Sequence, residues 1–432
     1  MKKLKKHSGR DIFVIGFALF SMFFGAGNVL FPPYLGMSAG PQWVLGFICY
    51  YIADIGLALV ALFSIFSRGS SHEIFRPVGK IPAMILFCAI VLCIGPMLAI
   101  PRTAATTYEL GIQPLTGGVN SIVFSIIFFV LVFICTVREN KVVDIVGKLM
   151  TPLLLIGLLI LIIVGIVHPL GPVGDAPQSL NVAADGIKNG YQTMDVLATM
   201  LFGILMLRTV EQKGYTEHHE KFSVSLKASL VAGVTMLLIY GGLTWLGASV
   251  ATRFDLSAGR ADVILTIVEE LLGHTGTVIF AVVVALACLT TAIGLVSSCA
   301  DFFAGLFKKH VSYEVFVVII CVFSAVVSNV GLDEIISIAA PILDIVYPPT
   351  LALIVLSYIK GADKFTCRFA AAGALIISAL TALNVYASVP MPFLGYLPFN
   401  SLGFGWLVPS AVLALIGWLI GRGSRKAPAA QS

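Results

Sequence analysis

Residues 23 to 33, FFGAGNVLFPP, decide the fold, because they place two glycines, an asparagine and a proline pair inside the first long apolar segment. Hydrocarbon offers no water to the backbone groups that such a break frees. The break therefore persists only where protein, ion or substrate satisfies those groups. The pattern predicts a broken membrane helix, and the break is a candidate binding site.

The composition is that of a chain embedded in a membrane. Of the 432 residues, 58% are hydrophobic and 11% are charged, and the mean hydropathy is +1.00, which excludes an ordinary soluble domain. Segments of about 20 apolar residues, enough to cross about 30 Å of hydrocarbon, recur along the chain. We expect an all-α integral membrane protein with twelve transmembrane helices, at residues 11–38, 42–67, 81–108, 120–138, 149–168, 187–210, 222–251, 275–307, 312–330, 333–359, 366–388 and 402–421.

The basic residues set the expected orientation. With the N-terminus in the cytoplasm, 23 of the 27 Lys and Arg residues fall on the inner side, which is a strong positive-inside bias. Both termini are then cytoplasmic. The basic N-terminal segment is similar to a signal peptide, but no small-residue cleavage site precedes the break, so we expect it to be retained. The same topology explains the net charge of +5 without a nucleic acid partner.

The connections between the segments hold no soluble domain. The longest are residues 67–80, 168–186 and 252–275, and the last contains ADVILTIVEELLG, residues 261–273. Its apolar stripe predicts a short helix on the outer face, which either packs there or takes part in a gate. The eight cysteines form no CxxC motif or Cys/His cluster, so we expect them to pack, without a disulfide or metal role.

A second interruption lies in residues 190–203, GYQTMDVLATMLFG, where Asp195 stands among apolar residues. Two broken helices, one opening each half of the chain, are typical of a secondary transporter built from inverted repeats. We therefore expect one transmembrane domain over residues 1–432, with the repeats at 11–168 and 187–359 and two additional helices at 366–421.

Three motifs carry a resemblance to a known family. GFALFSMFFGAGNVLFPPYLG (residues 16–36), GPMLAIPRTAATTYE (95–109) and GYQTMDVLATMLFG (190–203) resemble the branched-chain amino acid:cation symporters of bacteria. This family belongs to the amino acid-polyamine-organocation superfamily. The resemblance extends over essentially all twelve segments. It implies a LeuT-type fold, with a five-plus-five inverted repeat and two extra helices. It also implies sodium-driven uptake of leucine, isoleucine and valine across a bacterial inner membrane, with Na⁺ as the coupling ion, no cofactor and no obligatory protein partner.

The first break is suited to the carboxylate of an amino acid. Gly25, Ala26 and Gly27, beside Asn28, lack bulk, and the half-helix after them points free amides and its positive dipole end at an anion. Close helix packing is the alternative use of the glycines. An apolar side chain would be enclosed by a kink in the third segment and by the sixth segment, through Gly95, Pro96, Met194, Ala198 and Phe202.

A sodium site is expected between the first and eighth segments. The carbonyl groups of Ser21 and Phe24 come just before the break. Ala287, Thr290 and Thr291 share one face of the eighth segment. Together they offer five oxygens to a small hard cation, and the resemblance places a sodium ion there. Hydrogen bonds from the two threonines to their own backbone are the alternative.

Charged residues at membrane depth are usually functional. Asp195 would coordinate a second cation, receive the substrate ammonium, or cap amides at the break, and the sequence leaves these three roles open. Arg102, in the third segment, is expected to pair with an acid, and a role in an outer gate is the alternative. The candidate partners are Asp344, Asp54 and Glu109.

Other classes of function find less support in the sequence. A membrane enzyme would need a motif such as HExxH or GxSxG, and a nucleotide-driven pump would need a phosphate-binding loop. None of these is present, so we expect no enzyme. The remaining rival is a proton-coupled amino acid permease, or a transporter of the same fold for another small substrate such as a nucleobase. Lys148 would replace the cation by protonation, although topology alone explains a lysine on the inner side.

Overall fold

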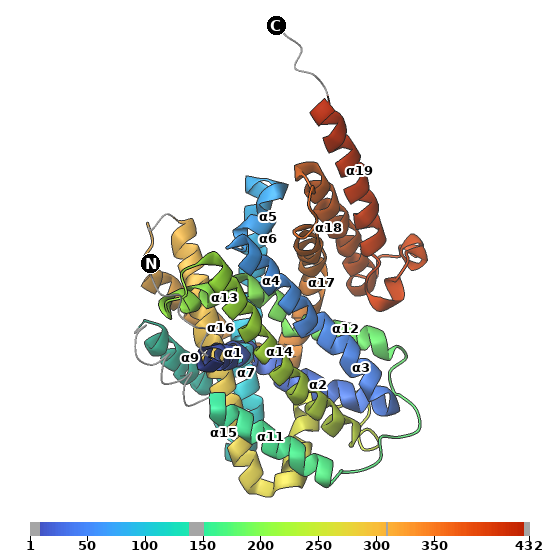
Figure 1. The fold of residues 1–432 in the computed structure, drawn as a ribbon. Helices are drawn as coiled ribbons and strands as arrows, with labels where there is room; N and C mark the ends of the chain where they lie inside the picture. The colour runs from blue at the N-terminus through green and yellow to red at the C-terminus, as the bar shows by residue number, and fades with distance from the viewer. Residues whose placement is uncertain (1–8, 138–150, 308–309, 427–432) are drawn as a thin grey trace.

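The computed structural model describes residues 9–137, 151–307 and 310–426, and within these ranges every regular element is a helix or a helical turn (Figure 1). Lys148 lies outside them. The helices are α1 Gly9–Phe23, α2 Ala26–Ala39, α3 Trp43–Tyr51, α4 Leu57–Arg68, α5 His72–Phe75, α6 Lys80–Leu92, α7 Ala99–Thr107, α8 Gln113–Thr116, α9 Ser121–Val137, α11 Thr151–Val167, α12 Val182–Thr193, α13 Asp195–Gln212, α14 His218–Ala248, α15 Arg260–Leu306, α16 Tyr313–Val327, α17 Leu332–Leu356, α18 Lys364–Tyr386 and α19 Leu407–Lys426.

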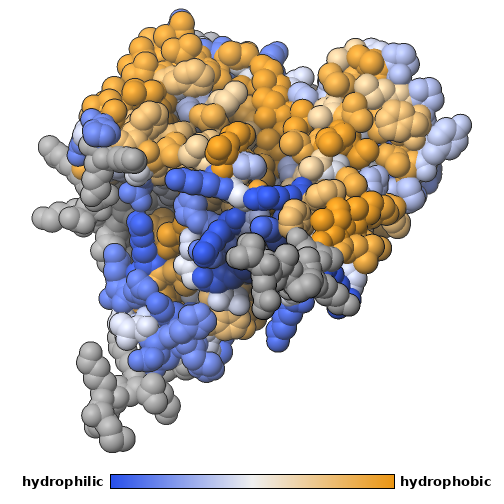
Figure 2. Space-filling view, turned by 90° about the horizontal axis from the view of Figure 1, so that it is seen from above, coloured by the Kyte–Doolittle hydropathy of each residue, from blue (hydrophilic) through white to orange (hydrophobic). Residues whose placement is uncertain are grey.

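Many helices in the described residues are long enough to span a membrane. Eight helical segments there are long and apolar enough to cross a bilayer, and three shorter apolar helices accompany them. Figure 2 shows one face of the molecule, on which hydrophilic residues gather over the centre and lower left and hydrophobic residues cover the top and right. These findings confirm a helical, multi-pass membrane protein. The count of twelve crossings stays a prediction, because α2, α3 and α4 follow one another as a single 43-residue segment after α1.

Both predicted breaks are present. α1 ends at Phe23, where the amide of Phe24 still donates to the Phe20 carbonyl oxygen at 2.7 Å, and α2 begins at Ala26. The second break falls at Met194, whose φ of 68° separates α12 from α13. Since a non-glycine residue adopts this left-handed conformation only at a cost, the surrounding contacts must hold it in place.

The third segment is also irregular, at the predicted kink. A π-helical turn, η4 Cys93–Met97, joins α6 to α7, and Gly95 inside it has φ −95° and ψ −131°. Pro96 follows directly and has no amide hydrogen to continue the helix. The kink thereby sets the direction of α7, which carries Arg102.

Glycines bring α2 and α14 into direct backbone contact. A methyl group on Gly36 would lie 1.9 Å from the Thr244 carbonyl oxygen, and one on Gly247 would lie 1.8 Å from the Pro33 carbonyl oxygen. The two helices pack along each other (Figure 1). Small residues at such a crossing let membrane helices approach closely, so this contact fixes the half-helix that follows the first break.

The short helix expected in residues 261–273 is present, and its location on the outer face stays a prediction. α15 begins at Arg260 and is kinked at Gly273, where φ is 62°. The piece before the kink is tied to α17 by an ion pair between Arg260 Nη1 and Asp333 Oδ1 at 2.6 Å. The preceding loop is held by α2, because the hydroxyl of Tyr34 donates to the Leu256 carbonyl oxygen at 3.0 Å.

Candidate functional site

The two helix breaks face one small cavity inside the protein. Its volume is about 30 Å³, which is room for about one water molecule. Nine of the residues predicted for the substrate and sodium sites line this cavity: Gly25, Ala26, Gly27, Asn28, Met194, Asp195, Ala198, Phe202 and Thr291.

Six predicted residues do not line this cavity. They are Ser21, Phe24, Gly95, Pro96, Ala287 and Thr290. A methyl group on Gly95 would meet the Cys299 sulfur of α15 at 3.0 Å, so the kink packs against α15 and its neighbour Ile94 reaches the cavity instead. The ring of Phe24 stacks on that of Phe20, with centroids 5.3 Å apart.

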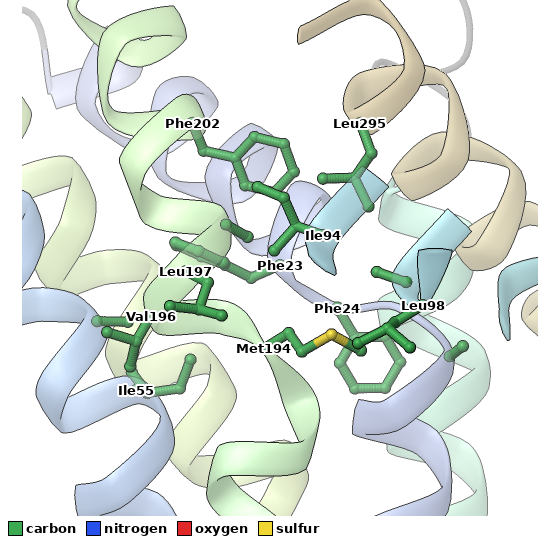
Figure 3. Packing of buried hydrophobic residues seen from close by; sticks show 14 of the residues in the cluster. Phe23, Phe24, Ile55, Ile94, Leu98, Met194, Val196, Leu197, Phe202 and Leu295 are labelled. Carbon is green, nitrogen blue, oxygen red and sulfur yellow. The ribbon is translucent and has the colours of Figure 1, made fainter. Parts of the chain in front are cut away.

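One wall of the cavity is apolar. Figure 3 shows Phe23, Ile94, Phe202 and Leu295 converging from α1, η4, α13 and α15. The rings of Phe23 and Phe202 meet edge to face, with centroids 5.8 Å apart, an arrangement that aromatic pairs favour. Sequence reasoning had selected only Phe202 of these four. In a chain this apolar, the one signal for Phe23 and Ile94 is that each stands next to an interruption of its helix.

The opposite side of the cavity is polar. The Asn28 side-chain amide donates to Asp195 Oδ2 at 2.8 Å and also to the Tyr240 hydroxyl oxygen. Asn28 and Asp195 are 2% and 4% exposed, so both hydrogens of a buried amide find acceptors. Asn28 thereby joins the first turn of α2, the first residue of α13 and the C-terminal half of α14. Tyr240 was missed, because a tyrosine in an apolar helix gives no sign of its partner.

A second buried acid lies behind the second break. Asp54 occupies the π-helical turn η2 Ile52–Gly56 between α3 and α4, and it is 0% exposed. Its Oδ1 accepts from the Thr193 hydroxyl at 2.8 Å, whereas its Oδ2 has no partner among the described residues. π-Helical turns often mark functional positions. Asp54 is close enough to interact with Asp195, so two buried acids flank Met194.

Arg102 binds backbone carbonyl groups. Its Nη1 donates to the Gln192 oxygen at 2.6 Å and its Nη2 to the Thr193 oxygen at 3.2 Å. These carbonyl groups belong to the last turn of α12, where the break removes the amides that would have paired with them. Arg102 therefore caps α12 from α7.

The prediction that Arg102 pairs with Asp344, Asp54 or Glu109 is wrong. Within the described residues, no carboxylate lies within 4.0 Å of its guanidinium. Asp344 accepts from the Tyr386 hydroxyl at 2.9 Å, and Glu109 accepts from the Leu332 amide at 3.0 Å. The three acids expected to pair with Arg102 thus accept hydrogen bonds from neutral donors instead.

The two threonines of the predicted sodium site have different surroundings. The Thr291 hydroxyl has no hydrogen-bond partner among the described residues and faces the first break, because a methyl group on Gly25 would lie 3.0 Å from it. The Thr290 hydroxyl donates to the Ala287 carbonyl oxygen at 2.8 Å. A buried hydroxyl without a partner fits a cation ligand. The five-oxygen cage itself stays a prediction.

Comparison with known proteins places the chain. Residues 8–424 match the model of a family described as branched-chain amino acid transport protein. The chain belongs to this family. It is 35% identical over 418 residues to the branched-chain amino acid permease BrnQ of Salmonella typhimurium, with 94% of each chain covered. It is 34% identical over 430 residues to the branched-chain amino acid transport system 3 carrier protein of Pseudomonas aeruginosa, with 96% of this chain and 98% of that protein covered. The family confirms a transporter, not an enzyme.

Solved structures agree with the LeuT-type fold. Mhp1, a nucleobase-cation-symport-1 family transporter in a closed conformation with bromovinylhydantoin bound, matches with a TM-score of 0.65 and 13% identity, over 96% of this chain and 93% of that one. A Na⁺-coupled sialic acid symporter in a substrate-bound outward-open state matches with a TM-score of 0.59 and 13% identity, over 94% and 90%. At this identity the likeness concerns the fold alone.

Proposed function

We propose that the protein takes up branched-chain amino acids in symport with sodium, by alternating access. The observation that carries the proposal is the composition of the single cavity between the two breaks. It combines a helix start with free amides, a buried carboxyl group and an apolar wall. These are the partners of a carboxylate, an ammonium group and an aliphatic side chain, in that order. The names of the relatives from Salmonella typhimurium and Pseudomonas aeruginosa agree with this substrate class.

Each part of the substrate has a proposed partner. The amides at Gly25 to Asn28 and the positive end of α2 favour a carboxylate. Asp195 receives the ammonium group, and the wall around Phe23 and Phe202 encloses the side chain, at about 0.8 kcal/mol for each buried methylene. A cavity of about 30 Å³ is too small for a leucine, so the helices must separate for the substrate to enter and leave. Alternating access supplies this motion.

Sodium is the proposed coupling ion. The Thr291 hydroxyl faces the first break and has no hydrogen-bond partner among the described residues, and carbonyl groups of Ser21 and Phe24 are the ligands we propose from α1. An ion held there joins α1 to α15 and shapes the backbone that receives the substrate. By linkage, sodium must raise the affinity for substrate as much as substrate raises the affinity for sodium. The inward sodium gradient then drives uptake.

The proposed membrane arrangement follows the sequence. It has twelve transmembrane helices, inverted repeats at 11–168 and 187–359, and two additional helices at 366–421. We propose that the protein lies in the inner membrane of a bacterial cell. The positive-inside bias then favours both termini on the cytoplasmic side. No protein partner is needed for this cycle.

Proton coupling is a second candidate, and the acids around Met194 favour it. Asp54 and Asp195 are buried on the two sides of the second break and interact with each other. Two buried carboxyl groups at close range resist simultaneous ionisation, so such a pair can hold a proton. A proton bound there would replace the ion as the coupling species.

Purified protein in liposomes distinguishes the candidates. We expect uptake of labelled leucine when a sodium gradient is imposed at equal pH, and none when a pH gradient is imposed in choline buffer. The reverse result would support proton coupling through the acid pair. Leucine uptake that is stimulated by neither gradient would contradict symport of branched-chain amino acids. The absence of any leucine uptake would contradict it as well. Protein-free liposomes give the background.

A further inference from the structure

Arg102 is a buried cation that forms no direct ion pair within the described residues, although Asp195, which lines the same cavity, attracts its charge at longer range. Its side chain is 3% exposed, and no carboxylate in the described part of the chain lies within ion-pair distance of it. A buried charge that forms no direct ion pair is costly. Capping of α12 alone does not explain a full positive charge, since neutral donors satisfy carbonyl groups as well.

The position of Arg102 points to an anion in the cavity. Two of its nitrogens are fixed by the Gln192 and Thr193 carbonyl oxygens, while its Nε has no partner among the described residues. Arg102 lines the same cavity as the first turn of α2. A methyl group on Gly27 would lie 3.0 Å from Arg102 Nη2, so the guanidinium stands directly beside the free amides of α2. Two independent anion-attracting groups thus meet at one point.

We infer that Arg102 binds the α-carboxylate of the transported amino acid, together with the amides of α2. The inference rests on the proposed function and makes it more specific. The substrate class becomes a zwitterion that must carry a carboxylate, held between Arg102 at one end and Asp195 at the other. Arginine suits this task, because its guanidinium presents several donors in one plane and remains charged when buried.

This assignment also links the two breaks. Arg102 already holds the end of α12 through the carbonyl groups of Gln192 and Thr193. A carboxylate seated between Arg102 and α2 draws the start of α2 toward the end of α12. Substrate binding would therefore bring the two broken helices together around the cavity, and an analogue without a carboxylate would bind without this contribution.

The test compares three ligands on three proteins by equilibrium binding. The ligands are leucine, leucinol, which lacks the carboxylate, and 4-methylpentanoate, which lacks the ammonium group. The proteins are wild type, Arg102→Gln and Arg102→Lys. In Arg102→Gln we expect the Kd of leucine to rise about 30-fold or more, the effect of removing one partner of a buried charge pair. The Kd of leucinol should change by less than threefold, because its contacts do not include Arg102. Binding of 4-methylpentanoate should weaken as leucine binding does.

Arg260→Gln is the matched control. Arg260 also lies over the Phe31 ring, at 6.0 Å against 5.7 Å for Arg102, but it pairs with Asp333 and does not line the cavity. The Arg260→Gln substitution should leave the ratio of leucine affinity to leucinol affinity unchanged. Arg102→Lys keeps the charge and should retain part of the preference for leucine.

Three results would overturn the inference. They are equal weakening of leucine and leucinol by Arg102→Gln, wild-type protein that binds the two ligands alike, and loss of all binding in both Arg102 variants, which would make the residue structural. A wild-type protein that binds no branched-chain amino acid is a different result, because it would contradict the proposed function itself.

Discussion

Glycines have different neighbours at the crossing of α2 with α14 and at the break between α1 and α2. At the crossing, methyl groups on Gly36 and Gly247 would run into backbone carbonyl groups at 1.9 and 1.8 Å. At the break, a methyl group on Gly25 would lie 3.0 Å from the Thr291 hydroxyl, and one on Gly27 would lie 3.0 Å from both the Arg102 guanidinium and the Phe31 ring. The first pair lets two helices touch. The second pair leaves polar groups facing a cavity.

The difference decides what each glycine contributes. Backbone at a helix crossing has no rotamer to change, so an added methyl group must push the helices apart. A threonine or arginine side chain can shift by a few tenths of an ångström, and the fold survives. Glycines that face backbone therefore serve packing, and we expect glycines that face polar side chains of the cavity to serve binding. The sequence offers both as the same residue type in the same apolar setting.

The largest effect is expected from Gly247→Ala. The added methyl group would overlap the Pro33 carbonyl, so we predict a loss of about 3 kcal/mol or more in stability and a sharp fall in the yield of folded protein. Thermal melting in detergent, followed by size-exclusion chromatography, measures this. Gly305→Ala is the control, since a methyl group there meets nothing within 4 Å and should leave the melting temperature unchanged or slightly higher. Normal stability of Gly247→Ala would show that the helices do not touch as described.

Gly25→Ala and Gly27→Ala should lower leucine affinity and leave the stability of the protein nearly unchanged. We predict nearly wild-type expression and melting, with leucine affinity lowered about 100-fold, because a small displacement of site groups costs this much where geometry is exacting. Scintillation-proximity binding of leucine measures the affinity. Gly294→Ala is a suitable control, as its methyl group would contact Phe202 at an ordinary 3.7 Å. If the Gly25 and Gly27 variants bind leucine normally, these glycines serve packing after all.

The breaks were predictable because their residues are poor helix formers in a place where helix is otherwise obligatory. GAGN and the isolated Asp195 stand out against apolar surroundings. The turn at Met194 was predicted to within a few residues, but a methionine with φ 68° carries no local signal. Tertiary contacts from both flanking acids and from Arg102 impose it.

The hydrogen-bond partners of the charged groups could not be predicted from the sequence. Arg102 was expected to seek an acid, since opposite charges attract over any separation in the chain. The carbonyl groups freed at the end of α12 compete for the same donors, and they win because α7 passes beside them. Likewise, Tyr240 reaches Asn28 only through the packing of α14 on α2. Such pairings depend on crossing angles, which composition and periodicity do not encode.

Asp195→Asn extends the comparison to a side chain that faces the cavity. An asparagine can still present an oxygen to Asn28, so the contact now measured at 2.8 Å survives while the charge is lost. We predict failure of transport and a fall of about 30-fold in leucine or sodium affinity, because the carboxylate serves a cation or the substrate ammonium. Leucine binding against sodium concentration gives both affinities.

Asp301→Asn is the matched control for Asp195→Asn. Asp301 pairs with Arg208 at 3.3 Å, and both side chains are exposed, so its loss should matter little. Binding curves for Asp195→Asn that overlay those of wild type would mean that Asp195 only caps or bridges the break.

The smallest effect tests the comparison between neighbouring residues. Thr291 faces Gly25 with a hydroxyl that has no partner in the described part of the chain, whereas Thr290 donates to the Ala287 carbonyl oxygen. Both Thr→Ala variants should weaken sodium activation more than they weaken leucine binding at saturating sodium. Thr291→Ala should have the larger effect, about tenfold in the sodium concentration for half-maximal binding, the value of one oxygen contact to a charge.

Thr291→Ser separates the hydroxyl from the methyl group and should restore most of the sodium response, because it keeps the oxygen beside the first break. Sodium titrations of leucine binding in the three threonine variants measure the effect. Wild-type sodium dependence in both alanine variants would exclude the α15 site and leave the buried acids as the coupling groups. A larger loss in Thr290→Ala than in Thr291→Ala would mean that the ion lies closer to Thr290 than to the hydroxyl that faces Gly25. The rule drawn from the glycines, that a group facing the break serves binding, would then fail for the residue packed most closely against it.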